Sequence, residues 1–430
     1  MCFQRPVERR KARNNADMDQ KSQLRRRVGL ILLAVFCVIP SLAEGYAILW
    51  GQRHGFTGKA LRDGLDFWAG GFLALQGHVA TVFNPAAYQI FLNGAFFPTA
   101  KTLTVHMWSY PPNYLLLATA FGWLAPWHAV LAFDALSLAL LVFILRLAQL
   151  PRLLILAVAA SPVSFENFLE GQNAALLTAL AAGGILLLPR RPRLAGVLAG
   201  LASMKPQLGL VLPLFLLRRS PLAFACAALA AIALAAASLW AFGPAAWAAF
   251  WTVTRPAMSN VLLTGQPKAF AGGLISVFAA VRFLGVHPAL AIQGAVTLAA
   301  ILWAWLRPLP AEVLILAALA SPYLHDYDLL GATLAVALLI QDRLRHGFLP
   351  GEAILFFLAW FGPGTLPWAP QFAHFAPLIL LLLLASAWRR GPVVPCDSSQ
   401  VPPVSPLSSA GRLPIPNPPN STAPGLPATE

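Results

Sequence analysis

Two carboxylates stand near the start of residues 51–112, the longest polar stretch in the body of the chain. Asp63 and Asp66 are separated by two residues and followed by aromatic and small residues. A carboxylate just beyond a membrane-spanning segment can act as a general base, which takes a proton from an attacking hydroxyl group. Solvated loop acids look the same in a sequence, so the base hypothesis depends on the other polar residues of the chain.

A second polar group separates two apolar runs. It contains Glu166, Glu170, Gln172 and Asn173. Side-chain amides suit sugar hydroxyl groups, because each amide offers both a hydrogen-bond donor and an acceptor. The simpler interpretation of these residues is a polar helix cap.

Lys205 interrupts a long apolar stretch and is followed by Pro206. A lone ammonium group in lipid costs about 2.5–3.5 kcal/mol on insertion scales, so such a lysine is a candidate functional residue. Its natural partner is a phosphate or a carboxylate. The alternative is a structural ion pair with Asp66 or Asp326.

The last group is the segment 321–328, which reads Ser-Pro-Tyr-Leu-His-Asp-Tyr-Asp. We expect no metal ion there, because no second His stands at ligand spacing from His325. A cradle for a phosphate and a sugar is a more economical interpretation. His325, Tyr327 and an acid such as Asp326 would form it.

The composition excludes a soluble protein. Charged residues make up 11% of the chain, hydrophobic residues make up 58%, and the mean hydropathy is +0.68. A soluble domain needs more polar surface than this. The net charge of +14 resides mostly in short basic turns and a basic N-terminus, which anchor topology and attract anionic lipid headgroups, so it does not indicate nucleic-acid binding. The four cysteines suggest neither a disulfide framework nor a metal motif.

Threading the apolar runs through a membrane separates the charges into two sets. Loops that keep Lys and Arg stay in the cytoplasm, so the Arg-rich turns mark the inner side. These turns contain Arg25 to Arg27, Arg146, Arg152, Arg190, Arg191, Arg193, Arg218, Arg219, Arg307, Arg343, Arg345, Arg389 and Arg390. The acidic pairs then share the external face. They are Asp63 and Asp66, Glu166 and Glu170, and Asp326 and Asp328. Further cations on that face could together attract an anionic lipid-phosphate donor. They are Arg53, Lys59, Arg62, Lys101, Arg255, Lys268 and Arg282.

The expected fold is an all-α polytopic membrane protein. The candidate spans are 28–50, 128–148, 152–164, 172–188, 193–217, 221–243, 288–306, 310–322, 328–341, 352–363 and 373–388. We interpret 193–217 as two half-spans that meet at the outer end of the membrane, because Pro206 removes a backbone donor. Segments 110–127 and 271–285 are expected to be re-entrant or to lie at the external surface.

The two ends of the chain differ from its body. Residues 1–27 are expected to form a basic cytoplasmic tail, and 28–50 a signal anchor. Residues 391–430 are rich in Pro and Ser and cannot bury enough apolar surface to fold, so they are expected to be a disordered cytoplasmic tail. The membrane domain is therefore predicted to span 28–390, with 51–112 as its first external loop.

Several short motifs follow one another in a definite order. They are Asp66 with the aromatic stretch and Tyr88 after it, Tyr110-Pro111-Pro112, Gly171-Gln172-Asn173, the segment from Gly200 to Pro206, and Ser321-Pro322. Together they resemble glycosyltransferase family 87, whose members are similar to polyprenyl-phosphate-mannose-dependent mannosyltransferases of bacteria. The resemblance covers about residues 28–390. It implies a GT-C-like bundle of about 10–13 transmembrane or re-entrant helices, with an external active-site cavity.

The resemblance also implies a reaction. A hexose or pentose, with mannose as the first candidate, would move from a polyprenyl-phosphate donor to a hydroxyl group of a lipid or glycan acceptor, without a cofactor. The family's base corresponds to Asp66, with Asp63 as the nearby alternative. The enzyme would lie in a bacterial inner membrane with both termini in the cytoplasm. One departure is Phe67-Trp68-Ala69, which stands where the family often has a Tyr, and this concerns the identity of the donor sugar.

The remaining polar residues receive roles in this hypothesis. The donor phosphate would meet Lys205, His325 and Arg282. The sugar or the acceptor would meet Tyr110, Glu170, Gln172, Asn173, Asp326 and Tyr327. Displacement in one step would invert the anomeric carbon.

Two other functions fit parts of the pattern. A transporter or flippase for a polyprenyl-linked intermediate would also need intramembrane charges and broken helices. Against it, the polar residues gather on one face without a polar path to the cytoplasmic side. A non-catalytic scaffold would use the Pro-rich tail to recruit a cytoplasmic partner.

Overall fold

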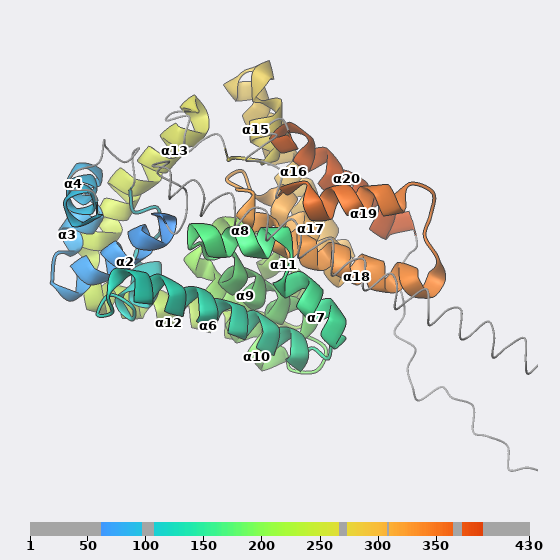
Figure 1. Ribbon diagram of the computed structural model, residues 1–430, viewed down its shortest axis with the longest axis horizontal. Helices are drawn as coiled ribbons and strands as arrows, with labels where there is room; N and C mark the ends of the chain where they lie inside the picture. Colours follow the sequence, from blue (N-terminus) through green and yellow to red (C-terminus); the bar gives the residue numbers. More distant parts are fainter. Residues whose placement is uncertain (1–61, 97–106, 266–272, 308, 364–371, 390–430) are drawn as a thin grey trace, which may run out of the picture. The chain divides into compact units, whose positions relative to one another are not determined.

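The computed structural model describes residues 62–96, 107–265, 273–307, 309–363 and 372–389, and these ranges are largely helical (Figure 1). Within them the β-type pairing is an isolated bridge between Leu274 and His325. The predicted first span at 28–50 and both predicted tails lie outside the described residues. Those three assignments therefore remain predictions.

Among the described residues, three helices are long and apolar enough to cross a membrane. They are α6 (Pro126–Leu147), α16 (Val286–Leu306) and the kinked helix Pro221–Thr264. The pair α7 (Arg152–Ala159) and α8 (Pro162–Glu170), bent by 46°, is together long and apolar enough to be either a broken span or a re-entrant segment. Shorter apolar helices are α9 (Ala174–Leu186), α17 (Pro310–Ala320), α19 (Glu352–Phe361) and α20 (Phe372–Arg389). The protein is an all-α polytopic membrane protein, as the sequence predicts.

The long helix Pro221–Thr264 shows why a membrane is needed. It comprises α12 (Pro221–Ala249), a π-helical turn η3 (Phe250–Thr254) and α13 (Arg255–Thr264). Only 11% of its most apolar window is buried within the protein, and Trp240 is 91% exposed. A soluble protein rarely exposes apolar surface of this extent, so lipid must cover it. The predicted span 221–243 ends at Gly243, where φ +75° and ψ 170° leave the helical region and kink the chain before Pro244.

Two glycines bring α10 (Pro192–Leu201) against α12. A Cβ atom at Gly196 would lie 2.2 Å from the carbonyl oxygen of Ala223, and one at Gly200 would lie 2.3 Å from that of Ala227. Glycines four residues apart allow helices in a membrane to pack backbone to backbone. Helix α10 also packs on α9, which in turn packs on α6 (Figure 1). This packing fixes the end of α10 that leads to Lys205.

The chain leaves the helical conformation at Lys205. Two 3₁₀ turns, η1 (Ala202–Met204) and η2 (Pro206–Leu208), separate α10 from α11 (Leu212–Arg219). Lys205 itself has φ −134° and ψ 76°, because a residue before proline is pushed out of the helical region. The predicted break into two half-helices is confirmed.

The polar stretch at the start of the chain is more helical than a loop. Its described part contains α2 (Arg62–Leu75), α3 (Val79–Val82) and α4 (Pro85–Phe96), and α5 (Pro112–Thr119) begins where the stretch ends. Leu65, Ala69 and Leu73 recur every four residues along α2 and are buried. Asp63 and Asp66 therefore project from a packed helix, which corrects their interpretation as loop residues.

The final part of the chain builds on α18 (Leu330–His346), which packs against α17, α19 and α20 (Figure 1). A 3₁₀ turn, η5 (Tyr327–Leu329), leads directly into α18. Between α13 and α16 the described residues form only a short helix, α15 (Val277–Val281), and a 3₁₀ turn, η4 (Arg282–Leu284). This agrees with the expectation that 271–285 does not form a full span.

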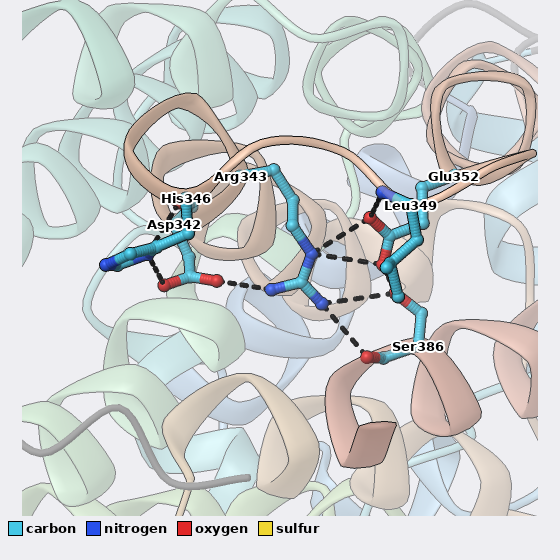
Figure 2. A network of polar contacts seen from close by, with 6 residues as sticks. All are labelled: Asp342, Arg343, His346, Leu349, Glu352 and Ser386. Atoms are coloured by element: carbon cyan, nitrogen blue, oxygen red, sulfur yellow. Dashed lines mark hydrogen bonds and ion pairs between the residues drawn. The ribbon is translucent and has the colours of Figure 1, made fainter. Parts of the chain in front are cut away.

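A buried polar network surrounds Arg343, near the C-terminal end of α18 (Figure 2). Arg343 is 2% exposed, and its Nε lies 3.0 Å from both carboxylate oxygens of Glu352. Its Nη2 donates to the carbonyl oxygen of Ser386 at 2.9 Å, and its Nη1 contacts the Asp342 carboxylate. Glu352 also accepts bonds from the Ser386 hydroxyl at 2.6 Å and the Leu349 N–H at 2.7 Å. Arg343 is thus a buried residue whose side chain connects α18 to α19 and α20. It is not a solvated cation of a basic turn, as the sequence analysis had placed it.

Candidate active site

A buried ion pair lies at the break after α10. The Lys205 Nζ is 2.6 Å from Oδ1 of Asp328, and the two side chains are 4% and 0% exposed. The ammonium group is also 3.4 Å from Oδ1 of Asn173 and 5.2 Å from the centroid of the Tyr327 ring. The counter-ion is therefore Asp328, and not Asp66 or Asp326, which were the partners considered in the alternative interpretation. A carboxylate in direct contact offsets part of the cost of burying the lysine charge.

The segment around η5 presents its side chains in fixed positions. Oδ1 of Asp326 accepts a bond from the Tyr327 N–H at 3.0 Å, and the Ile275 N–H donates to the Leu324 carbonyl oxygen at 2.8 Å. The His325 ring stacks on the Tyr327 ring with centroids 5.2 Å apart and planes 2° apart. The structure thus places Tyr327 beside Lys205, with His325 stacked on Tyr327 and Asp326 bonded to the Tyr327 backbone.

Asn173 joins a second segment to this cluster. Its Nδ2 donates to the hydroxyl oxygens of Tyr110 at 2.9 Å and Tyr114 at 3.0 Å, while its Oδ1 faces Lys205. The two tyrosine rings stack with centroids 4.2 Å apart. The Asn173 side chain does not cap α9. Asn167 supplies a bond there, because its Oδ1 accepts from the Ala174 N–H at 2.6 Å. The helix-cap interpretation therefore fails for Asn173.

Gln172 connects the cluster to α2. Its Nε2 donates to Oδ2 of Asp63 at 2.5 Å. The contact is possible because Gly171 and Gly64 meet back to back, so that a Cβ atom at Gly171 would lie 2.7 Å from the Gly64 Cα. Gly171 also ends α8 with φ +67°, a conformation that glycine adopts without strain.

The tyrosines of the cluster are neutral hydroxyl groups. Burial raises the pKa of Tyr110 and Tyr327 well above the usual value of 10. The negative charges of Asp328 and Asp63 raise both pKa values further. Neutral phenols and side-chain amides can both donate and accept, which is what a sugar hydroxyl group requires.

Three predicted site residues lie at or beyond the edge of this arrangement. Asp66 is half-buried one turn along α2 from Asp63, and the Tyr88 hydroxyl donates to its backbone carbonyl at 2.5 Å. Glu170 ends α8, and its charge acts on Tyr327. Arg282 donates to the Leu263 carbonyl oxygen at 2.5 Å and lies 6.0 Å from the Phe278 ring. Its contacts are thus with α13 and α15, and they do not bring it to Lys205.

A model of glycosyltransferase family 87 matches residues 108–324, which include Tyr110, Gln172, Asn173 and Lys205. The chain belongs to glycosyltransferase family 87. Curated proteins and solved structures give no match. The family assignment makes the protein a glycosyltransferase. The matched range includes neither α2 nor the residues from His325 onward. These parts of the site are connected to the matched range by the contacts of Asp63 with Gln172 and of Asp328 with Lys205.

The family 87 site contains residues that the sequence analysis did not assign. Tyr114 lies in α5, four residues after Tyr110, and its ring stacks on the Tyr110 ring. Asp328 stood in an acidic pair but had no role. Asp134 is a lone acid inside the apolar helix α6, is 2% exposed, and has no hydrogen bond to either carboxylate oxygen among the described residues. An ionisable residue inside a membrane span is a functional candidate by default. Its position in an apolar run of the sequence could therefore have identified Asp134 as a candidate.

A substitution at Gly171 should separate α2 from α8 in this transferase. Gly171→Ala forces a methyl group into the Gly64 backbone and strains a positive φ, so we expect a loss of about 1–3 kcal/mol of stability and weaker transfer as the Asp63–Gln172 bond lengthens. Thermal unfolding and initial transfer rates measure the two effects. Gly77→Ala is the matched control, because Gly77 has φ +76° and no atom lies within 4 Å of the place that a Cβ atom would take. Equal effects of both substitutions would contradict the role of the close approach.

Proposed function

We propose that this glycosyltransferase moves a sugar from polyprenyl phosphate to a hydroxyl group of a lipid or glycan acceptor, at the external face of a bacterial inner membrane. The observation that carries the proposal is the setting of Lys205. Its buried ammonium group, paired with Asp328, stands among neutral phenols and amides, in a protein whose helices have apolar faces that need lipid. A phosphate, a sugar and an isoprenoid chain are the three chemical parts of such a donor. Mannose is the first candidate sugar.

The reaction is a single displacement. The acceptor oxygen attacks the anomeric carbon and loses its proton to a carboxylate on α2, for which Asp66 is the candidate and Asp63 the alternative. As the new C–O bond forms, the bond between the anomeric carbon and the phosphate oxygen breaks, and its electron pair stays on the phosphate. Attack from the face opposite the leaving phosphate inverts the anomeric carbon. A base across the sugar from Lys205 suits this geometry.

The charges of the site match those that develop during transfer. Positive charge grows on the sugar ring, and the carboxylates of Asp63, Asp328 and Glu170 lie close enough to Tyr327 to act on its pKa. Negative charge grows on the leaving phosphate, and Lys205 and His325 are the candidates that would stabilise it. Groups fixed beforehand by hydrogen bonds stabilise such charges without reorganising. Gln172, Asn173 and Tyr110 would orient the sugar and acceptor hydroxyl groups.

A transfer assay tests the proposal. Purified protein in lipid would receive radiolabelled polyprenyl-phosphate mannose, other polyprenyl-phosphate sugars, and a membrane lipid extract as acceptor. Label that enters a new glycosidic product, with release of polyprenyl phosphate, would support the proposal. Movement of the labelled donor between leaflets without a new bond would instead support a flippase, and nucleotide-sugar-dependent transfer would exclude the lipid donor.

A further inference from the structure

Asp328 was given no role by the family resemblance, yet its carboxylate has an unusual pair of partners. Oδ1 contacts the Lys205 ammonium at 2.6 Å, and Oδ2 accepts a bond from the backbone N–H of His325 at 3.2 Å. One side chain therefore fixes both groups that the proposed function assigns to the donor phosphate. The side chain is 0% exposed, so the contact to Lys205 is sheltered from water.

The position of the ammonium group follows from these contacts. An ammonium group has three N–H donors, and Asp328 with Asn173 can occupy two of them. Among the described residues this leaves one donor for a phosphate oxygen. The centroid of the Tyr327 ring lies 5.2 Å from Nζ of Lys205, and the His325 ring stacks on the Tyr327 ring. Lys205 and His325 therefore both contact the Tyr327 ring.

The structure also separates this ion pair from the rest of the acidic cluster. Asp63 is engaged by Gln172, and Asp326 accepts from the Tyr327 N–H. Asp328 is thus the acid that directly contacts Lys205. Removing it would leave a buried ammonium without its counter-ion, free to adopt other positions, and such an unpaired buried charge is costly.

We infer that Asp328 is a positioning residue for the donor phosphate. It holds the Lys205 ammonium and the His325 backbone in the arrangement that receives the phosphate, and it does not itself contact the sugar. This inference rests on the proposed phosphate role of Lys205. Because Asp328 would act through Lys205, the losses of donor kcat/KM caused by substituting the two residues should not be additive in free energy.

A double-mutant cycle on donor kinetics tests this. Lys205→Met, Asp328→Asn and the double variant are compared with the unchanged protein, with polyprenyl-phosphate mannose varied at saturating acceptor. We expect each single substitution to lower kcat/KM for the donor by about 100-fold, and the double substitution to lower it by about 100-fold as well. The KM for the acceptor should stay unchanged. Losses that multiply to about 10,000-fold would overturn the role of Asp328.

Two controls separate the possible failures. Glu352→Gln weakens another buried ion pair, at the far end of α18, and should lower thermal stability without changing donor kinetics. Unchanged kinetics of Lys205→Met would overturn the phosphate role of Lys205, and thereby the proposed function of this cluster, whereas multiplying losses would remove only the Asp328 inference. Should Asp328→Asn fail to fold, Asp328→Glu keeps the charge but moves it. It should lower donor kcat/KM when Lys205 is present and have no effect in the Lys205→Met protein, and an equal loss in both would overturn the inference.

Discussion

Replacing Asp66 by Asn should reduce sugar transfer by about 1,000-fold while leaving the fold intact. A general base contributes about 10²–10⁴-fold, and an amide cannot take the proton of the acceptor hydroxyl group. The substitution is nearly isosteric, and the bond from the Tyr88 hydroxyl goes to the backbone carbonyl of this residue, which the change leaves in place. Initial rates with radiolabelled polyprenyl-phosphate mannose measure the loss. Donor binding can be measured by titration with the lipid donor or from the amount of donor that co-purifies with the protein. Unchanged donor binding in the Asp66→Asn protein would assign the loss to the chemical step.

Asp63→Asn is the matched comparison one turn away on α2. The substituted side chain would keep an oxygen for the Gln172 amide, so we expect a loss of about tenfold, seen mainly in KM as weaker orientation of the substrate. The reverse order, with Asp63→Asn inactive and Asp66→Asn nearly normal, would transfer the base to Asp63. Normal turnover of both variants would remove the base from α2 altogether.

The local sequence was sufficient to predict those elements whose conformation depends on neighbouring residues in the chain. The break at Lys205 follows from Pro206, and the long apolar helices follow from uninterrupted hydrophobic runs. The kink at Gly243 likewise agrees with the end predicted for the span 221–243, whereas the helical stretch that resumes at Pro244 and runs to Thr264 was not predicted. The helical state of α2 was missed because its polar residues concealed the four-residue spacing of Leu65, Ala69 and Leu73.

The grouping of the site residues was predicted better than their pairing. The sequence placed Lys205, Asn173 and the segment 321–328 on one face, and the structure joins them through direct contacts. The choice of Asp328 over Asp326 as the counter-ion depends on the backbone direction in η5. Asp326 turns toward the Tyr327 N–H, and Asp328 turns toward Lys205. Two acids that are two residues apart cannot be distinguished in this way before the turn is known.

The largest effect on stability should come from Arg343→Met. Methionine leaves the Glu352 carboxylate buried with bonds to the Ser386 hydroxyl and the Leu349 N–H but without its cation (Figure 2). Removing one partner of a buried ion pair costs about 3–5 kcal/mol, and here α18 would also lose its bond to the Ser386 carbonyl. Unfolding of the purified protein in detergent, by heat or by denaturant, measures the loss.

Arg345→Met provides the control, because Arg345 lies on the same helix but is exposed. A surface change of this kind should alter stability by no more than about 0.5 kcal/mol. The double variant Arg343→Met/Glu352→Leu should recover much of the loss, since it removes the stranded charge together with its partner. Equal stability of the Arg343→Met and Arg345→Met proteins would show that the network contributes no more than a surface contact. Failure of the double variant to recover would instead place the stabilisation in the hydrogen bonds that this variant also lacks. These are the bonds from Arg343 to Ser386 and the bonds that Glu352 accepts from the Ser386 hydroxyl and the Leu349 N–H.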